Sequence, residues 1–438
     1  MANSYFSRST ATSIVIANMI GTGVFTSLGF QLVDIDSAFV ILLLWALGGL
    51  LAFCGALCYA ELGAALPRSG GEYNFLGRIY HPAAGFISGW ISSTIGFAAP
   101  TALAAITAAT YLNTVVESAP VKLVAVVLVV VVTAVHLGSR RQGGGFQFLM
   151  TAVKVFLIIA FVLAAWIFVE APQALHWGPQ ASDLGLMGTG GFAVALIYVN
   201  YAYTGWNAAT YLAGEVETPQ RNLPFILMVG TLLVAGLYLL LHVMFLTVAP
   251  MDAMRGQLEI GYVVARYAFG ELGSQGVAVM LSVLLVSTVS AMVLAGPRAL
   301  QVIGQDFKVL SVLGRENRHG IPHVAILTQA AFTIILIVTS SFEAILVFAS
   351  FTLALNTLLT ILGVGVLRRK QPDVPRPFEV PWYPLPVIIY VGITLWTLVY
   401  VGIERPVEAA FAAGLIASGW LFYLVSKDRV TGEEYKQS

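Results

Sequence analysis

Two short stretches decide the fold of this sequence: Met19-Ile20-Gly21-Thr22-Gly23-Val24-Phe25 and Tyr201-Ala202-Tyr203-Thr204-Gly205-Trp206-Asn207. Each lies near the middle of a long apolar run, at a place where glycine and polar side chains weaken a helix. We therefore expect both helices to be interrupted there. Backbone groups that are freed inside a membrane are costly unless protein, water or a ligand satisfies them. The two interruptions thus predict a binding site between them.

The flanking sequence predicts a membrane protein. Of its 438 residues 58% are apolar and only 10% are charged, and the mean hydropathy is +0.86. No charged residue lies between Arg8 and Asp34, or between Asp183 and Glu215, and each run exceeds the roughly 20 residues that span hydrocarbon. Because a soluble globular protein is about one-quarter charged, this composition excludes that class.

Hydropathy predicts an all-α membrane protein with about twelve transmembrane helices. They are expected near residues 10–32, 38–66, 83–112, 121–137, 146–168, 190–213, 225–249, 273–303, 324–339, 344–367, 385–403 and 407–425. The interrupted first and sixth helices begin corresponding blocks of five helices. This order is typical of a LeuT-like 5+5 inverted repeat with discontinuous helices 1 and 6. We expect the repeats to comprise residues 1–168 and 188–368, with two peripheral helices in 383–426.

The basic residues predict the orientation in the membrane. If the N-terminus is inside, only Lys122, Arg255, Arg266 and Arg405 lie in outer segments, and Lys154 lies within a helix. All other lysines and arginines then lie on the inner side, where membrane proteins concentrate positive charge. Both termini are therefore expected in the cytoplasm.

Five stretches resemble one family, the amino acid-polyamine-organocation (APC) permeases, and in particular its bacterial L-type amino acid transporter branch. They are GTGVF at Gly21–Phe25, PRSGGEY at Pro67–Tyr73, YAYTGWN at Tyr201–Asn207, GEVETPQRNLP at Gly214–Pro224 and AGPR at Ala295–Arg298. The resemblance covers essentially the whole chain. It implies ten core helices in two inverted repeats, two peripheral helices, transport by alternating access, and a location in the bacterial plasma (inner) membrane.

The resemblance also implies a substrate site. The main chain around Gly21 and Gly23 would hold the backbone of an amino acid, Tyr201 would be an aromatic gate where the branch commonly has Phe, and the stretch after it would shape the side-chain pocket. The candidate substrate-binding residues are Ile20, Gly21, Thr22, Gly23, Val24, Tyr201, Ala202, Tyr203, Gly205, Trp206 and Asn207. Physical reasoning agrees, since half-helix starts favour a carboxylate and half-helix ends an ammonium. We expect the glycines at 21 and 23 to adopt positive φ.

Lys154 is the one basic residue in the body of a predicted helix, the fifth, where an ammonium is costly. Its long stem allows the amine to return to the interface. The family resemblance implies a different role, in which the amine replaces the sodium ion of related sodium-coupled carriers and bridges the first and eighth helices. Ser287, Thr288 and Ser290 are candidate partners, although each could instead bond a carbonyl of its own helix.

These features predict a sodium-independent carrier, either an exchanger (antiporter) or a proton symporter, of small to medium neutral L-amino acids. The side chain of the substrate is expected to be neutral, because helices one, three, six and eight carry no Asp, Glu, Lys or Arg at mid-depth that could pair with a charged side chain. A cationic amino acid or polyamine permease stays open, since aromatic rings also bind cations, as does an amino acid sensor built on a transporter scaffold. An ion channel is disfavoured by the single-chain inverted repeat.

The sequence offers no nucleophile with a base, no metal-ligand cluster and no paired carboxylates, so we expect neither an enzyme nor a cofactor or metal site. Cys54 and Cys58 are expected to be small packing residues. Eukaryotic L-type relatives attach a helper subunit through a cysteine in the loop after the third helix, whereas Leu112 to Lys122 contain none. The expected partners are the amino acid, the lipid bilayer and, for a symporter, protons, without a disulfide-linked helper subunit or a nucleic acid.

Overall fold

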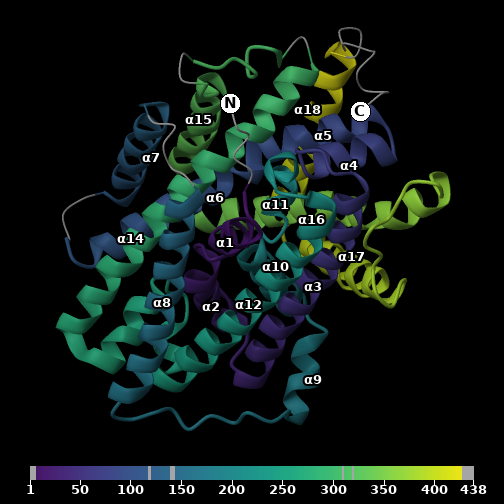
Figure 1. The fold of residues 1–438 in the computed structure, drawn as a ribbon. Coiled ribbons are helices and arrows are strands. Elements are labelled where there is room, and N and C mark those ends of the chain that lie inside the picture. Colours follow the sequence, from purple (N-terminus) through teal and green to yellow (C-terminus); the bar gives the residue numbers. More distant parts are fainter. Residues whose placement is uncertain (1–5, 117–119, 139–143, 308–309, 318–319, 427–438) are drawn as a thin grey trace.

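The computed structural model describes residues 6–116, 120–138, 144–307, 310–317 and 320–426, and within them the fold is all-helical (Figure 1). The first half contains α1 (Arg8–Met19), α2 (Gly23–Asp34), α3 (Ala38–Ala65), α4 (Glu72–Ile79), α5 (Pro82–Ile91), a π-helix (Ser92–Gly96), α6 (Ala98–Asn113), α7 (Val121–Gly138), α8 (Gly144–Phe168) and α9 (Ala181–Met187). The second contains α10 (Gly190–Tyr203), α11 (Ala208–Tyr211), a 3₁₀ turn (Ala213–Glu215), α12 (Pro219–Val248), α13 (Met251–Met254), α14 (Ile260–Asp306), α15 (His323–Thr339), α16 (Phe342–Lys370), α17 (Leu385–Glu404) and α18 (Pro406–Ser426).

The membrane class is confirmed. Within the described residues, 10 helices are long and apolar enough to cross a membrane, or up to 11 if the bent pair of α9 and α10 is one span. The apolar helix α15 is shorter than these ten helices and corresponds to the ninth predicted segment, residues 324–339. Helix α14 consists of two helices that meet at a kink, because Gly270 has a non-helical backbone (φ 70°). The kink lies just before residue 273, where the eighth helix was predicted to start.

Both predicted interruptions are present. The first helix stops at Met19 and resumes at Gly23, so that α1 and α2 are two halves of one span. Helix α10 ends at Tyr203, and the short α11 begins only at Ala208. The third predicted helix is also irregular, because a π-helical turn lies between α5 and α6. The sequence analysis did not predict this turn.

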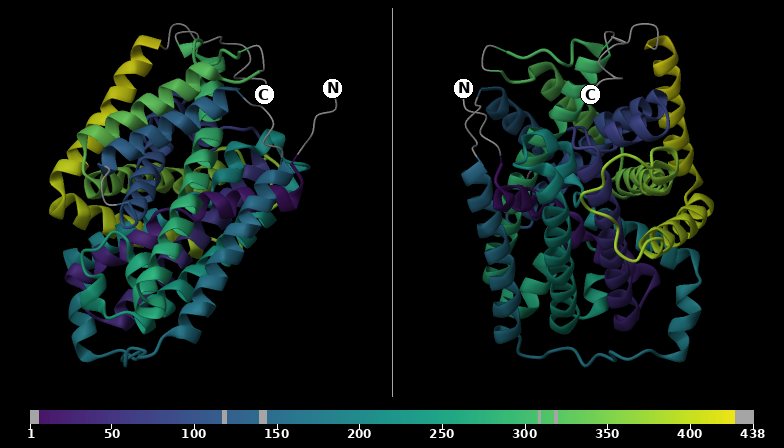
Figure 2. Two further views of the ribbon diagram at one scale, coloured as in Figure 1. Left: turned by 90° about the vertical axis from the view of Figure 1, so that its left-hand side faces the viewer. Right: turned by 45° about the vertical axis from the view of Figure 1, so that its right-hand side comes forward.

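The broken helices lie in the middle of the bundle (Figure 1). Helix α1 packs between α8 and α12, and α2 packs on α10. Helix α3 packs along α12, and α14 packs along α6. Both views of Figure 2 show the segment 169–180 crossing one end of the molecule, with α9 beside it. The breaks therefore lie among the core helices and not at the lipid-facing surface of the bundle.

A buried charged group near the end of α3 is paired. Glu61 on α3 is fully buried, and its carboxylate accepts hydrogen bonds from the Arg368 guanidinium at 2.7 and 2.8 Å and from the Val380 N–H at 2.7 Å. These bonds join α3 to α16 and to the segment before α17.

Cys54 and Cys58 are buried free thiols of α3. Among the residues used to predict orientation, Arg140, Arg141, Lys308, Arg318, Lys427, Arg429 and Lys436 lie outside the described residues.

Candidate functional site

The two helix breaks touch one another. A Cβ atom built on Gly23 would lie 2.5 Å from the Cα of Ala202, and one built on Gly205 would lie 2.8 Å from the backbone of Asn18. Of the three glycines at positions 21, 23 and 205, Gly205 alone has a positive φ, at 101°. The expectation of positive φ at Gly21 and Gly23 is therefore wrong: glycine at 23 is required by the close approach of two backbones, while Gly21 has only an ordinary contact with Thr288 at 3.5 Å.

A tyrosine on α12 joins the breaks. The buried hydroxyl of Tyr238 lies 2.6 Å from the carbonyl oxygen of Met19 and 3.1 Å from that of Ala202, and it donates to these oxygens. Each oxygen belongs to the last turn of a half-helix, where carbonyl groups have no partner within the helix. One side chain thus supplies a donor to both breaks. The sequence offered no signal for this role, because Tyr238 lies in an uninterrupted helix.

Lys154 on α8 is also directed at the first break. Its Nζ is buried and donates to the Ile20 carbonyl at 3.2 Å and to the Thr288 hydroxyl at 3.0 Å. The amine therefore bridges the first helix to α14 and does not return to the membrane interface. Of the other candidate partners, the Ser290 hydroxyl is bonded to His136 at 2.8 Å, and no described hydrogen bond joins Ser287 to Lys154.

Donors remain free at the start of α2. The Thr22 hydroxyl is buried without a hydrogen-bond partner among the described residues, and Thr22 directly precedes the first helical residue, Gly23. The first N–H groups of an α-helix have no acceptor within the helix and carry partial positive charge. The carbonyls of Met19 and Ile20 at the first break are therefore bonded, whereas the Thr22 hydroxyl is available to an anionic group.

Two small cavities border the second break. One, of about 40 Å³, lies between α3, α10 and α16 and is lined by Tyr201, Tyr203 and Trp206. The other, of about 70 Å³, is lined by Asn18, Trp206 and Asn207 among others. Both are smaller than typical ligand pockets of about 300–1,000 Å³, so the centre of the molecule is contracted.

The remaining candidate side chains differ in their surroundings. The hydroxyl of Tyr203 donates to the Trp45 carbonyl at 3.0 Å, and its ring packs on Trp45 and Tyr238. Ile20, Val24 and Ala202 are buried in the core. Tyr203 is thus tied to α3 and α12, and it also lines the cavity of about 40 Å³.

Comparison with known proteins decides the family. A model of the amino acid permease family matches residues 6–425. The chain belongs to this family. It is 27% identical to the b(0,+)-type amino acid transporter 1 of Mus musculus over 427 residues, which cover 94% of the chain and 85% of that protein. It is 28% identical to the large neutral amino acids transporter small subunit 2 of Homo sapiens over 440 residues, which cover 95% and 79%. The permease is accordingly a membrane transport protein and not an enzyme.

The permease has a buried carboxylate beside its second break that sequence reasoning missed. Glu72, the first residue of α4, accepts hydrogen bonds from the Tyr59 hydroxyl at 2.9 Å, from the Asn207 amide at 2.6 Å and from the Tyr211 hydroxyl. It also lines the 70 Å³ cavity. Since Asn207 and Tyr211 flank α11, the carboxylate fixes the continuation of the sixth helix.

Sequence reasoning missed Glu72 because the prediction of a neutral substrate considered charged residues only on helices one, three, six and eight. The residue enters the centre from the connection between α3 and α5. A signal was present in the motif Ser69-Gly70-Gly71-Glu72: two glycines, with φ of 114° and 54°, turn the chain so that the next residue points inward. Such φ values favour glycine, so the doubled glycine before an acidic residue could have identified it.

The close approach at Gly23 predicts different effects of two alanine substitutions. Gly23→Ala should lower the stability of the permease by about 1–3 kcal/mol, the usual range for overpacking, because its methyl group would meet the backbone of Ala202. Gly21→Ala should melt near the wild type, since its new contact is ordinary. Thermal unfolding of the purified proteins in detergent measures both. Equal melting temperatures for the two variants would contradict the packing described here.

The Glu72 network predicts a second result. Glu72→Gln removes a charged acceptor of three hydrogen bonds, each worth about 1.5–3 kcal/mol when charged, and places an amide donor opposite Asn207. We expect a lower melting temperature and weaker amino acid binding. The control is Glu217→Gln, an exposed carboxylate after α11, which should behave as the wild type. Unchanged stability and binding in Glu72→Gln would show that the carboxylate does not fix the second break.

Proposed function

We propose that the permease is a secondary active transporter of small to medium neutral L-amino acids that works by alternating access. The observation that carries this proposal is the pair of touching helix breaks, at which the Thr22 hydroxyl is buried without a partner among the described residues while the carbonyls of Met19 and Ile20 are bonded. The N–H groups of Gly23 and Val24, at the start of α2, also lack an acceptor within the helix. The relatives of the chain include a large neutral amino acids transporter subunit, which agrees with this substrate class.

The backbone of the substrate would bind in a fixed orientation. Its carboxylate would accept hydrogen bonds from the N–H groups between Gly21 and Val24 and from the Thr22 hydroxyl, at the positive end of α2. Because Tyr238 and Lys154 already bond the carbonyls of Met19 and Ile20, the ammonium would bind at the second break. It would use a carbonyl other than those of Tyr201 and Ala202, which already accept hydrogen bonds. The side chain would face Tyr201, Trp206 and Asn207.

The architecture that we propose for transport is the inverted repeat. Residues 1–168 and 188–368 would form the two repeats, and 383–426 the peripheral helices. Both termini would lie in the cytoplasm of a bacterial cell, with the permease in the plasma membrane, because of the distribution of basic residues. No disulfide-linked helper is needed in this proposal. Residues 117–119 of the loop from Leu112 to Lys122 lie outside the described residues.

The charge of the substrate depends on Glu72. Its carboxylate lines the central cavity, which favours a cationic amino acid as a second candidate substrate. However, both carboxylate oxygens already accept hydrogen bonds from Tyr59, Asn207 and Tyr211. A cation would have to replace these donors, so we favour neutral substrates. Lysine and a polyamine belong in the substrate panel for this reason.

Sodium should not be required, because the Lys154 ammonium already supplies a positive charge between the first helix and α14. Counterflow into proteoliposomes, measured with a panel of amino acids, should be fastest for neutral L-amino acids and almost unchanged when choline replaces sodium. A pH gradient separates exchange from proton symport. A large loss of rate in choline would refute the assignment of Lys154, and binding without counterflow would indicate a sensor.

Lys154→Met should abolish or severely reduce counterflow, since methionine fills a similar volume but cannot donate to the Ile20 carbonyl and the Thr288 hydroxyl. Thr288→Ser keeps the hydroxyl and should retain transport. Melting temperatures recorded in parallel distinguish a loss of folding from a loss of transport. Wild-type rates in Lys154→Met would show that the bridge between the first helix and α14 is dispensable.

A further inference from the structure

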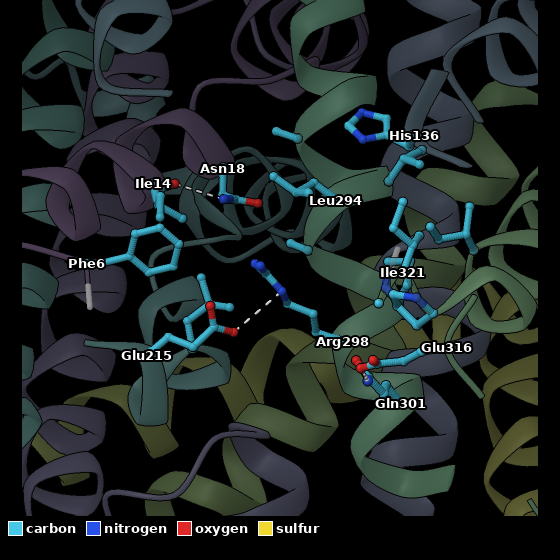
Figure 3. Close-up of a pocket in the computed structure, with 18 residues that line it drawn as sticks. Phe6, Ile14, Asn18, His136, Glu215, Leu294, Arg298, Gln301, Glu316 and Ile321 are labelled. Atoms are coloured by element: carbon cyan, nitrogen blue, oxygen red, sulfur yellow. Dashed lines mark hydrogen bonds and ion pairs between the residues drawn. The ribbon is translucent and has the colours of Figure 1, made fainter. Parts of the chain in front are cut away.

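A larger cavity lies next to the first break, on the side that we propose to be cytoplasmic. Its volume is about 340 Å³, within the range of small-molecule sites. Its walls come from α1, from the segment between α11 and α12, from α14 and from the start of α15 (Figure 3). Asn18 borders both this cavity and the central one of about 70 Å³. The larger cavity therefore lies on the route between the helix breaks and this face.

Two opposite charges meet inside this cavity. Arg298 on α14 points into the space between Asn18 and Glu215 (Figure 3). Its Nε lies 3.5 Å from a carboxylate oxygen of Glu215, and the two side chains are 31% and 45% exposed. Charge-assisted hydrogen bonds are usually near 2.7–2.9 Å, so the pair is loose. Among the described residues, no hydrogen bond satisfies the Arg298 guanidinium.

The other polar groups on the walls are engaged. The Glu316 carboxylate accepts a hydrogen bond from the Gln301 amide at 2.7 Å, and His136 is bonded to Ser290 at 2.8 Å. The backbone around Glu215 is held in place as well, because its carbonyl accepts from the Phe6 N–H at 2.7 Å. The cavity thus combines one guanidinium with free donors, one loosely paired carboxylate on a fixed backbone, and apolar walls.

We propose that this cavity is a second binding site for the zwitterionic backbone of an amino acid, with the carboxylate on Arg298 and the ammonium on Glu215. This inference rests on the proposed function. A guanidinium binds a carboxylate through two parallel N–H groups, and the neighbouring carboxylate accepts from the ammonium. A ligand with only one of these charges would leave one partner unpaired. Ile14, Leu294 and Ile321 supply apolar walls for a neutral side chain.

The site would hold an amino acid that has left the helix breaks or is about to enter them. This second site would therefore affect the apparent affinity of the permease for an amino acid at the cytoplasmic face and not at the outer face. Alternatively, the Arg298–Glu215 pair could act only as a latch, that is, an ion pair that holds α14 to the segment after α11. Loss of such a latch would shift the conformational equilibrium and so change the KM at both faces. These two roles give different kinetics.

The test uses the full chain in proteoliposomes of known orientation, with labelled L-alanine and, in parallel, L-leucine as probes. Arg298→Gln should raise the KM at the cytoplasmic face about tenfold or more, as expected for the loss of a charged hydrogen bond, and leave the KM at the outer face within about twofold. Arg298→Lys keeps the ion pair but not the two-pronged contact, so its cytoplasmic KM should also rise. The control is Arg369→Gln, an exposed arginine at the end of α16, which should match the wild type.

Three results would overturn the inference. An unchanged cytoplasmic KM in Arg298→Gln would remove the site but leave the proposed function intact, because the variant still transports. Equal changes at both faces, with wild-type behaviour in Arg298→Lys, would identify a latch. Failure of the wild type to transport any amino acid would refute the proposed function, and this inference with it. The unaltered outer KM also shows that the variant is folded.

Discussion

The structure depends on one constraint: backbone groups freed in the middle of a membrane protein must find hydrogen-bond partners. Breaking the first and sixth helices exposes carbonyl groups at the ends of α1 and α10 and N–H groups at the start of α2. Tyr238 and Lys154 reach from two unbroken helices to donate to the carbonyls of Met19, Ala202 and Ile20. The protein thus satisfies the acceptors and leaves donors, which an anionic group can use.

The same constraint explains the charges around the breaks. Glu72 accepts hydrogen bonds from Asn207, just before α11, and from Tyr211, the last residue of α11, and so fixes the continuation of the sixth helix. Arg298 and Glu215 carry charge to the larger cavity beside the first break. These groups come from α4, from α14 and from the segment between α11 and α12, all outside the broken helices. The site is therefore assembled around the breaks by the connections as much as by the core helices.

Sequence reasoning located the breaks because glycine and polar residues inside an apolar run conflict with helix formation at a fixed, local position. It also identified Lys154, since a charge in the body of a membrane helix is conspicuous. It misjudged Gly23, where the cause is the approach of Ala202 from a distant part of the chain. Tyr238 escaped notice for the same reason, because its role depends on tertiary contacts and a tyrosine inside an uninterrupted helix is unremarkable in a sequence. Glu72 also acts through tertiary contacts, but the two glycines before it were a local signal that the prediction did not use.

The central claim is that the freed donors at the start of α2 bind the carboxylate of an amino acid. A structure of the permease with a neutral L-amino acid bound tests it most directly. The account predicts the carboxylate within hydrogen-bond distance of the N–H groups between Gly21 and Val24 and of the Thr22 hydroxyl, with the ammonium at the second break. An amino acid found only elsewhere in the molecule, with these donors still unbonded, would contradict it.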